Sequence, residues 1–165
     1  MPGDGKTVSW HQDAPYWPFT PTKTVTAWIA IDNADEENSA MEVIPRSHLV
    51  GPIQTRQSRP EEGNVLWETI DSNISDYGAP VSMSMKAGEM SLHSDLLLHG
   101  SKPNISNRRR CGLTIRYASV DVRSTKNWNS SSILCRGKDI SGHWANRPRP
   151  IGNNPFAEVK KIGDN

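Results

Sequence analysis

Alternating side-chain patterns constrain the fold of this chain more than any other feature, because a period of two residues belongs to β-strands. The clearest case is VSMSMKA (81–87), where Val81, Met83, Met85 and Ala87 fall on one face. Similar segments rich in β-branched or aromatic residues predict further strands at 24–32, 40–45, 89–101 and 111–122. No helical period persists, and residues 59–70 are at best a short helix or a loop. The pattern predicts an all-β fold.

Turn-forming residues and chain length define the expected organisation. The 12 glycines and 12 prolines are spread along the chain, which favours many short segments joined by turns, such as those at 33–39 and 85–90. A chain of 165 residues, 35% of them hydrophobic, is long enough for one domain with a core but short for two. We expect a single domain over residues 1–165, with an irregular tail from about residue 124.

Charge and cysteine content exclude several classes of protein. The 19 Lys and Arg residues nearly balance the 18 Asp and Glu residues, so no large field of one sign favours nucleic acid or a membrane surface. No apolar run approaches the length of a membrane span, and the N-terminus lacks the features of a signal peptide. Cys111 and Cys135 are too few for a disulfide framework and are expected to be reduced. We expect a soluble, unsecreted, cytoplasmic protein.

Two His-x-Asp motifs stand out, His11-Gln12-Asp13 and His93-Ser94-Asp95. Both lie in strand-like segments, where residues i and i+2 share a face, and His99 continues the alternation that begins at His93. Two imidazoles and one carboxylate on neighbouring strands form the facial triad that leaves coordination positions open on Fe(II). Zn(II) is the rival metal, since the same ligands suit it. Hydrogen-bonded or solvated histidines of a sheet are the alternative without a metal.

A run of three arginines follows His99, at the entry to the strand predicted at 111–122. Alternation places Arg108 and Arg110 on one side and Arg109 on the other, so one of the three is expected to face the same cavity as the metal. A guanidinium pairs with a carboxylate through two hydrogen bonds, which a lysine does not do. A basic patch for nucleic acid is the alternative, but the run lacks interleaved aromatic residues.

Three stretches of this sequence resemble the phytanoyl-CoA dioxygenase family of Fe(II)- and 2-oxoglutarate-dependent oxygenases. They are residues 10–48, which begin WHQDAPYWPF, residues 88–118, which contain HSDLLLHGSKPNISNRRRCGLTIRYA, and, more loosely, LCRGKDISGHW at 134–144. The resemblance implies a double-stranded β-helix, a cupin-like jelly-roll of two facing antiparallel sheets with the metal between them.

Carried over residue by residue, the resemblance implies that His11, Asp13 and His99 are the iron ligands. The motif His93-Ser94-Asp95 is then excluded from the ligand set. Retention of Asp13 implies hydroxylation or a kindred oxidation, because related halogenating enzymes replace this carboxylate with a small residue.

The resemblance also implies how the co-substrate is held. Arg110 is the arginine that matches the family's partner of the distal carboxylate of 2-oxoglutarate. Gln12, Trp28 and Ser101 sit at positions where family members line the co-substrate pocket.

The activity implied is that of an Fe(II)- and 2-oxoglutarate-dependent dioxygenase acting on a small-molecule substrate. It would hydroxylate an unactivated carbon with O2 while 2-oxoglutarate is decarboxylated to succinate. The resemblance implies no nucleic-acid partner and no membrane partner.

The segment before the first motif is shorter than the family's usual one, since only MPGDGKTVS precedes the stretch that begins at Trp10. We therefore expect an N-terminally short jelly-roll whose uncovered sheet edge favours a homo-oligomer. The alternative function is a catalytically silent, truncated β-domain of the same fold that binds metal or ligand. A Zn(II) hydrolase of cupin-like shape is a third possibility, against which Arg110 argues.

Overall fold

Residues 2–149 are described by the computed structural model, and their regular structure is almost entirely β. The strands are β1 (Val8–His11), β2 (Phe19–Thr20), β3 (Thr24–Ala30), β4 (Glu42–Val43), β5 (Thr55–Gln57), β6 (Glu68–Ile70), β7 (Val81–Ser82), β8 (Met90–Ser94), β9 (His99–Ser101), β10 (Gly112–Ala118) and β11 (Arg123–Ser124). Five short 3-10 helices complete the described part: η1 (Ala14–Tyr16), η2 (Ser47–Val50), η3 (Pro60–Glu62), η4 (Ile74–Asp76) and η5 (Trp128–Ser131). Within this part of the chain, no helix is long and apolar enough to cross a membrane. The all-β prediction is confirmed.

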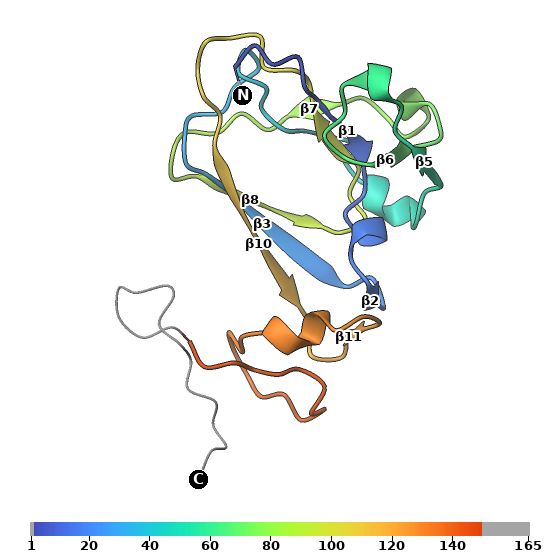
Figure 1. Ribbon diagram of the computed structural model, residues 1–165, viewed down its shortest axis with the longest axis vertical. Coiled ribbons are helices and arrows are strands. Elements are labelled where there is room, and N and C mark those ends of the chain that lie inside the picture. The colour runs from blue at the N-terminus through green and yellow to red at the C-terminus, as the bar shows by residue number, and fades with distance from the viewer. Residues whose placement is uncertain (1, 150–165) are drawn as a thin grey trace. The chain divides into compact units, whose positions relative to one another are not determined.

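Most strands belong to a first compact unit, which comprises the chain up to Trp17 together with Thr22–Ser119. It contains a four-stranded sheet in the order β1-β9-β4-β7, a three-stranded sheet in the order β10-β3-β8, and the pair β5-β6. Figure 1 shows β8, β3 and β10 side by side. The strands of these sheets pair antiparallel. Side chains from the two larger sheets meet between them, because the rings of His93 on β8 and His99 on β9 have centroids 4.8 Å apart. This is the arrangement of two facing sheets expected for a jelly-roll.

The segment 89–101 departs from the simple alternation that the sequence suggested. It forms two strands, β8 and β9, which belong to different sheets and are separated by a turn that begins at Asp95. The expectation that His93, Asp95 and His99 follow one another along a single strand face is therefore wrong. The carboxylate of Asp95 explains the break, because its Oδ2 accepts hydrogen bonds from the amide and hydroxyl of Thr24, at 3.1 and 2.8 Å.

The other predicted strands are observed with shorter bounds. The segments 24–32 and 111–122 contain β3 and β10, which pair in register from Thr24↔Ala118 to Ala30↔Gly112. The segment 81–87 is a strand only at β7, and Val81 is 47% exposed rather than buried. Beyond β7 the chain makes isolated contacts instead, such as the mutual backbone hydrogen bonds of Met85 and Ala34, each 2.8 Å long.

Two small hydrophobic clusters support the first unit. One contains Trp28 and the alanines Ala30, Ala34 and Ala40, and the other contains Ile44, Ile70 and Leu98. Trp28 lies across β10 at Gly112, where an added Cβ would come within 2.2 Å of the indole Cζ2. A side chain at residue 112 would therefore displace the indole, so glycine keeps Trp28 in place.

The second compact unit comprises Pro18–Pro21 and the chain from Val120 onward. Its described part contains the pair β2-β11 and the helix η5, and the ring of Phe19 contacts Trp128 and Trp144 edge-on. From Ser132 to Arg149 it has no regular structure, and residues 150–165 of the predicted tail lie outside the described residues. The single-domain organisation expected from the chain length stays a prediction.

Candidate active site

The two histidines expected to bind the metal face each other across a strand pair. His11 ends β1 and His99 begins β9, and the two are direct partners in the antiparallel register. Side chains of directly opposed residues point to the same face of a sheet. Asp13 lies two residues beyond His11, at the start of η1, rather than within the strand. The structure thus brings His99 to the pair His11 and Asp13, which lies more than 80 positions earlier in the sequence.

The spacing of these three side chains suits one metal ion. The Nε2 atoms of His11 and His99 each lie 3.9 Å from Oδ1 of Asp13. One possible ligand atom from each residue falls within 4.8 Å of the others, and all three residues are buried. Two imidazoles and one carboxylate in this arrangement form a facial triad.

Backbone carbonyls hold both imidazoles in the tautomer that a metal requires. The Nδ1 of His11 lies 2.8 Å from the carbonyl oxygen of Ser9, and the Nδ1 of His99 lies 2.9 Å from that of Leu97. In each case Nδ1 donates to the carbonyl, so the lone pair of Nε2 remains available beside Asp13. The residues present therefore fit a divalent metal ion.

Asp13 is held ionised by its neighbours. Arg116 Nη2 donates to its Oδ1 and the Thr26 hydroxyl to its Oδ2, both at 2.9 Å. Burial opposes ionisation, but the neighbours of the carboxyl, Arg116 and Thr26 among them, outweigh it and keep its pKa well below the usual range. A charged carboxylate and two neutral imidazoles are the protonation states in which these groups bind metal.

Burial also keeps the imidazoles neutral, since it lowers the pKa of His99 to about 3 and lowers the pKa of His11. The metal-free protein is therefore expected to lose stability as the pH falls below 6.5, the ordinary value for these groups. Below that pH the unfolded chain binds protons that the folded chain excludes, so the free energy of unfolding falls by up to about 1.4 kcal/mol per pH unit for each histidine. Urea unfolding of the metal-free protein between about pH 7.5 and pH 5 measures this slope. The variant His99→Gln should show a shallower slope, and an unchanged slope would contradict the assignment.

The triad opens into a cavity of about 210 Å³. Three of the four residues predicted to hold the co-substrate line it, namely Trp28, Ser101 and Arg110. The guanidinium of Arg110 lies over the ring of Trp28, with Cζ 5.9 Å from the ring centroid. Burial lowers the pKa of Arg110, and no acidic side chain of the described residues offsets this effect. A half-buried cation without an anionic partner among the described residues is a ready binding group for a carboxylate.

The other two arginines of the run are already paired. Arg108 donates to both carboxylate oxygens of Asp35 at 2.8 Å, and Arg109 contacts Asp32 at 2.7 and 2.8 Å. Both ion pairs lie away from the cavity, whereas Arg110 lines it. The structure thus places Arg110, which the resemblance selected from the run, in the cavity, and the other two arginines outside its lining.

Gln12 does not line the cavity, which corrects the expectation that it contacts the co-substrate. Its side chain is buried elsewhere, with Nε2 donating to the carbonyls of Gly51 and Leu96 at 3.0 and 2.7 Å. Its Oε1 accepts from the amide of Ile53 at 2.9 Å. Because successive residues of an extended chain point in opposite directions, Gln12 faces away from the side shared by His11 and Asp13.

Gln12 is therefore expected to support stability rather than co-substrate binding. The variant Gln12→Leu leaves three backbone groups without partners, and we expect the free energy of unfolding to fall by about 3 kcal/mol or more. Urea unfolding measures this loss, and calorimetric titration of the folded, metal-loaded variant should give unchanged affinity for 2-oxoglutarate. Weakened 2-oxoglutarate binding without a loss of stability would restore Gln12 to the pocket.

Two residues of the cavity with ionisable side chains were not expected there from the sequence. His93 lines it, although its motif partner Asp95 is bound to Thr24 and takes no part. Arg116 lines it as well. The signal for Arg116 was the alternation along β10, which places it on the same face as Arg110 and Thr114.

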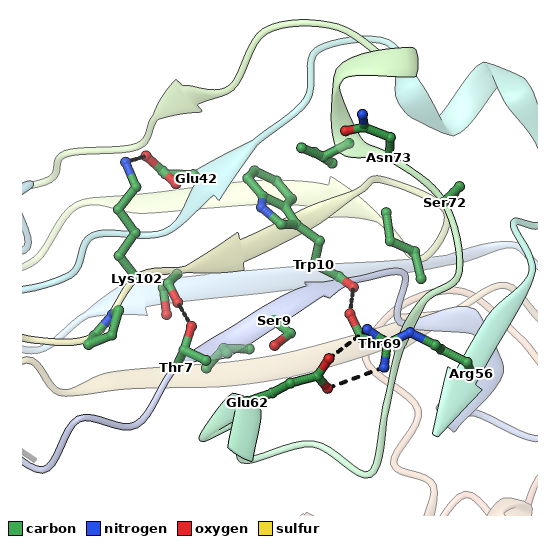
Figure 2. A pocket seen from close by; sticks show the side chains of 15 residues that line it. Thr7, Ser9, Trp10, Glu42, Arg56, Glu62, Thr69, Ser72, Asn73 and Lys102 are labelled. Atoms are coloured by element: carbon green, nitrogen blue, oxygen red, sulfur yellow. Dashed lines mark hydrogen bonds and ion pairs between the residues drawn. The ribbon is translucent and has the colours of Figure 1, made fainter. Parts of the chain in front are cut away.

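A second cavity of the first unit, of about 410 Å³, is shown in Figure 2. Its charged groups are paired with one another, since Arg56 contacts Glu62 at 2.6 Å and Lys102 contacts Glu42 at 2.7 Å. The Thr69 hydroxyl donates to the carbonyl of Trp10 at 3.0 Å. This cavity offers neither the triad nor Arg110, so it is not the candidate active site.

The sequence is similar to one protein family and to several known proteins. Residues 1–112 match the family described as phytanoyl-CoA dioxygenase (PhyH). A probable alpha-ketoglutarate-dependent hypophosphite dioxygenase of Stutzerimonas stutzeri is 34% identical over 124 residues, covering 73% of this chain and 43% of that protein. The peroxisomal phytanoyl-CoA dioxygenase of Bos taurus is 32% identical over 140 residues, covering 78% of this chain and 41% of that protein.

Solved structures confirm the predicted jelly-roll. The non-heme monooxygenase ThoJ in its apo form matches with a TM-score of 0.70 and 28% identity, covering 85% of this chain and 50% of that one. The chain thus spans half or less of the length of these three relatives.

Proposed function

The chain belongs to the phytanoyl-CoA dioxygenase family, and from this premise we propose that it is an Fe(II)- and 2-oxoglutarate-dependent dioxygenase that hydroxylates a small organic molecule. The observation that carries the proposal is the presence of the His11, Asp13 and His99 triad and the unpaired guanidinium of Arg110 in one cavity. The guanidinium of Arg110 beside the triad suits the distal carboxylate of a C5 dicarboxylate, which it can bind through two hydrogen bonds.

Each of these residues has a distinct task in the proposed reaction. His11, Asp13 and His99 would hold Fe(II) as a facial triad, a ligand set that leaves coordination positions for other ligands. Arg110 binds the 5-carboxylate of 2-oxoglutarate, with Trp28 packed against the guanidinium. The bound iron supplies the redox chemistry that couples O2 and 2-oxoglutarate to oxidation of the substrate. The protein contributes position, charge and the exclusion of water.

Anaerobic titration tests the proposal without knowledge of the substrate. The full chain should bind Fe(II), and subsequent addition of 2-oxoglutarate should produce a weak visible metal-to-ligand absorption band. Admission of O2 should then release succinate slowly even without a substrate. Absence of both the band and succinate would contradict the proposal.

The same titration separates the two other functions. A silent domain of the same fold would show the band but form no succinate, and its relatives, named as oxygenases, do not favour it. A Zn(II) hydrolase would be indifferent to 2-oxoglutarate.

A further inference from the structure

Three polar residues form a row across the three-stranded sheet, opposite Asp13. Thr26 of β3 is in register with Arg116 of β10 on one side and with His93 of β8 on the other. Directly opposed residues share a face, and all three side chains approach the same carboxylate. Arg116 and Thr26 donate to Asp13, while Nε2 of His93 lies 3.7 Å from its Oδ2. The row therefore forms the wall of the cavity beside the triad.

His93 has no partner for either nitrogen within the described part of the chain. Its side chain is only 4% exposed, and neither Nδ1 nor Nε2 makes a hydrogen bond. The 3.7 Å separation from Asp13 is too long for one. A buried polar group left without a partner costs about 1–3 kcal/mol. Because His93 lines the cavity, a ligand there can supply the missing hydrogen bond.

Arg116 also retains unused hydrogen-bonding capacity. Its Nη2 donates to Asp13, but its Nε is buried and has no partner among the described residues. The guanidinium lies over the ring of Trp17, with Cζ 4.1 Å from the ring centroid. Stacking on an aromatic ring fixes the plane of the guanidinium and leaves its edge donors free to bind an oxyanion.

The charges that line the cavity favour an anionic ligand beyond the co-substrate. The carboxylate and guanidinium groups that line the cavity are one carboxylate, Asp13, and two guanidiniums, Arg110 and Arg116, and together they carry a net charge of +1. A divalent metal adds two positive charges and the 2-oxoglutarate dianion removes two, so one positive charge remains. An unbalanced charge in a buried site is unfavourable, and a monoanionic substrate would neutralise it.

We propose that His93 and Arg116 form a second oxyanion-binding site in the cavity, which takes the carboxylate or a similar acid group of the primary substrate. The inference rests on the proposed function and deepens it. Arg110 would bind the co-substrate, and the row of Thr26, His93 and Arg116 would select substrates that carry an anionic group. The primary substrate is then a small organic acid that is oxidised at a carbon near its charged end.

A charge-matched pair of small molecules tests this inference. The full chain is loaded with Mn(II), which suits the same ligands but replaces the reactive iron, and is saturated with 2-oxoglutarate. Isothermal titration calorimetry then measures the binding of butyrate and of butyramide, which have nearly the same shape but differ in charge. We expect butyrate to bind at least about tenfold more tightly than butyramide.

The ratio of butyrate affinity to butyramide affinity is then measured in variants. A general loss of folding or of metal lowers both affinities alike and leaves this ratio unchanged. Arg116→Gln should bring the ratio close to one, and His93→Phe should lower it several-fold. Arg116→Lys, which keeps the charge but loses the planar fork, should give an intermediate ratio and serves if Arg116→Gln fails to load Mn(II). Arg109→Gln is the matched control and should leave the ratio unchanged, because Arg109 is exposed and paired with Asp32.

Several outcomes would overturn the inference. One is a ratio near one in the unaltered protein, and another is an unchanged ratio in the Arg116 and His93 variants. Weaker 2-oxoglutarate binding in these variants with an unchanged ratio would instead assign the row to the 1-carboxylate of the co-substrate. If the unaltered protein binds Mn(II) and 2-oxoglutarate but does not prefer butyrate, only this inference fails. If it binds neither, the proposed function fails as well.

Discussion

Replacement of His99 by glutamine is expected to lower the affinity for Fe(II) by more than about 100-fold, because loss of an outer-shell partner alone typically costs 10–100-fold. His99 is a direct candidate ligand, its Nε2 lying 3.9 Å from Oδ1 of Asp13. Only two ligands remain in the variant, so succinate formation from 2-oxoglutarate should be lost as well. Anaerobic titration with Fe(II), followed by an assay for succinate, measures both effects.

His48 provides a matched control for this substitution. It lies on η2 and is exposed, so His48→Gln makes the same chemical change away from the cavity. The control should retain full Fe(II) affinity and full succinate formation. Thermal unfolding of both variants separates loss of metal from loss of fold. Unchanged Fe(II) affinity in a folded His99→Gln variant would remove His99 from the triad.

Replacement of Arg110 by glutamine is expected to weaken binding of 2-oxoglutarate by about 30-fold or more, since loss of one partner from a buried, hydrogen-bonded charge pair costs about 2–5 kcal/mol. Affinity for Fe(II) should remain, because the guanidinium is not a metal ligand. Arg110→Lys should recover only part of the loss, because an ammonium lacks the planar fork. The KM for 2-oxoglutarate in the succinate assay and the calorimetric affinity of the metal-loaded protein both measure the effect.

The neighbouring arginine supplies the control. Arg109→Gln removes the same side chain one position earlier in the chain, where it is 69% exposed and paired with Asp32. This variant should bind 2-oxoglutarate as the unaltered protein does. If Arg110→Gln binds it normally and Arg116→Gln does not, the co-substrate arginine is Arg116 and the roles of the two residues are exchanged.

The strands and the candidate ligands were accessible from the sequence because both depend on local patterns. The alternation and β-branched content of 24–32 and 111–122 predicted β3 and β10. The two His-x-Asp motifs and the histidine of HGS supplied a short list of ligands from which the family resemblance chose three. Residue type and a period of two are properties of neighbouring residues, so no tertiary information was needed.

The two His-x-Asp motifs could not be told apart by local pattern. His11 and His99 converge because they are partners in the register of β1 and β9, which joins residues 88 positions apart. Asp95 has the same spacing from His93 as Asp13 has from His11, yet it binds Thr24 and ends β8. Nothing within the His-x-Asp motif distinguishes Asp95, which lies at the turn after β8, from Asp13, which lies beside two imidazoles.

The sequence by itself determined an all-β fold, the two His-x-Asp motifs and a run of arginines, because these follow from residue type and spacing along the chain. The tertiary structure decided which arginine enters the cavity, that Gln12 faces away from it, and that His93 and Arg116 stand beside Asp13. The physical reason is that strand register and the stacking of two sheets arise from contacts between distant residues, such as Asp13 and Arg116, which are 103 positions apart.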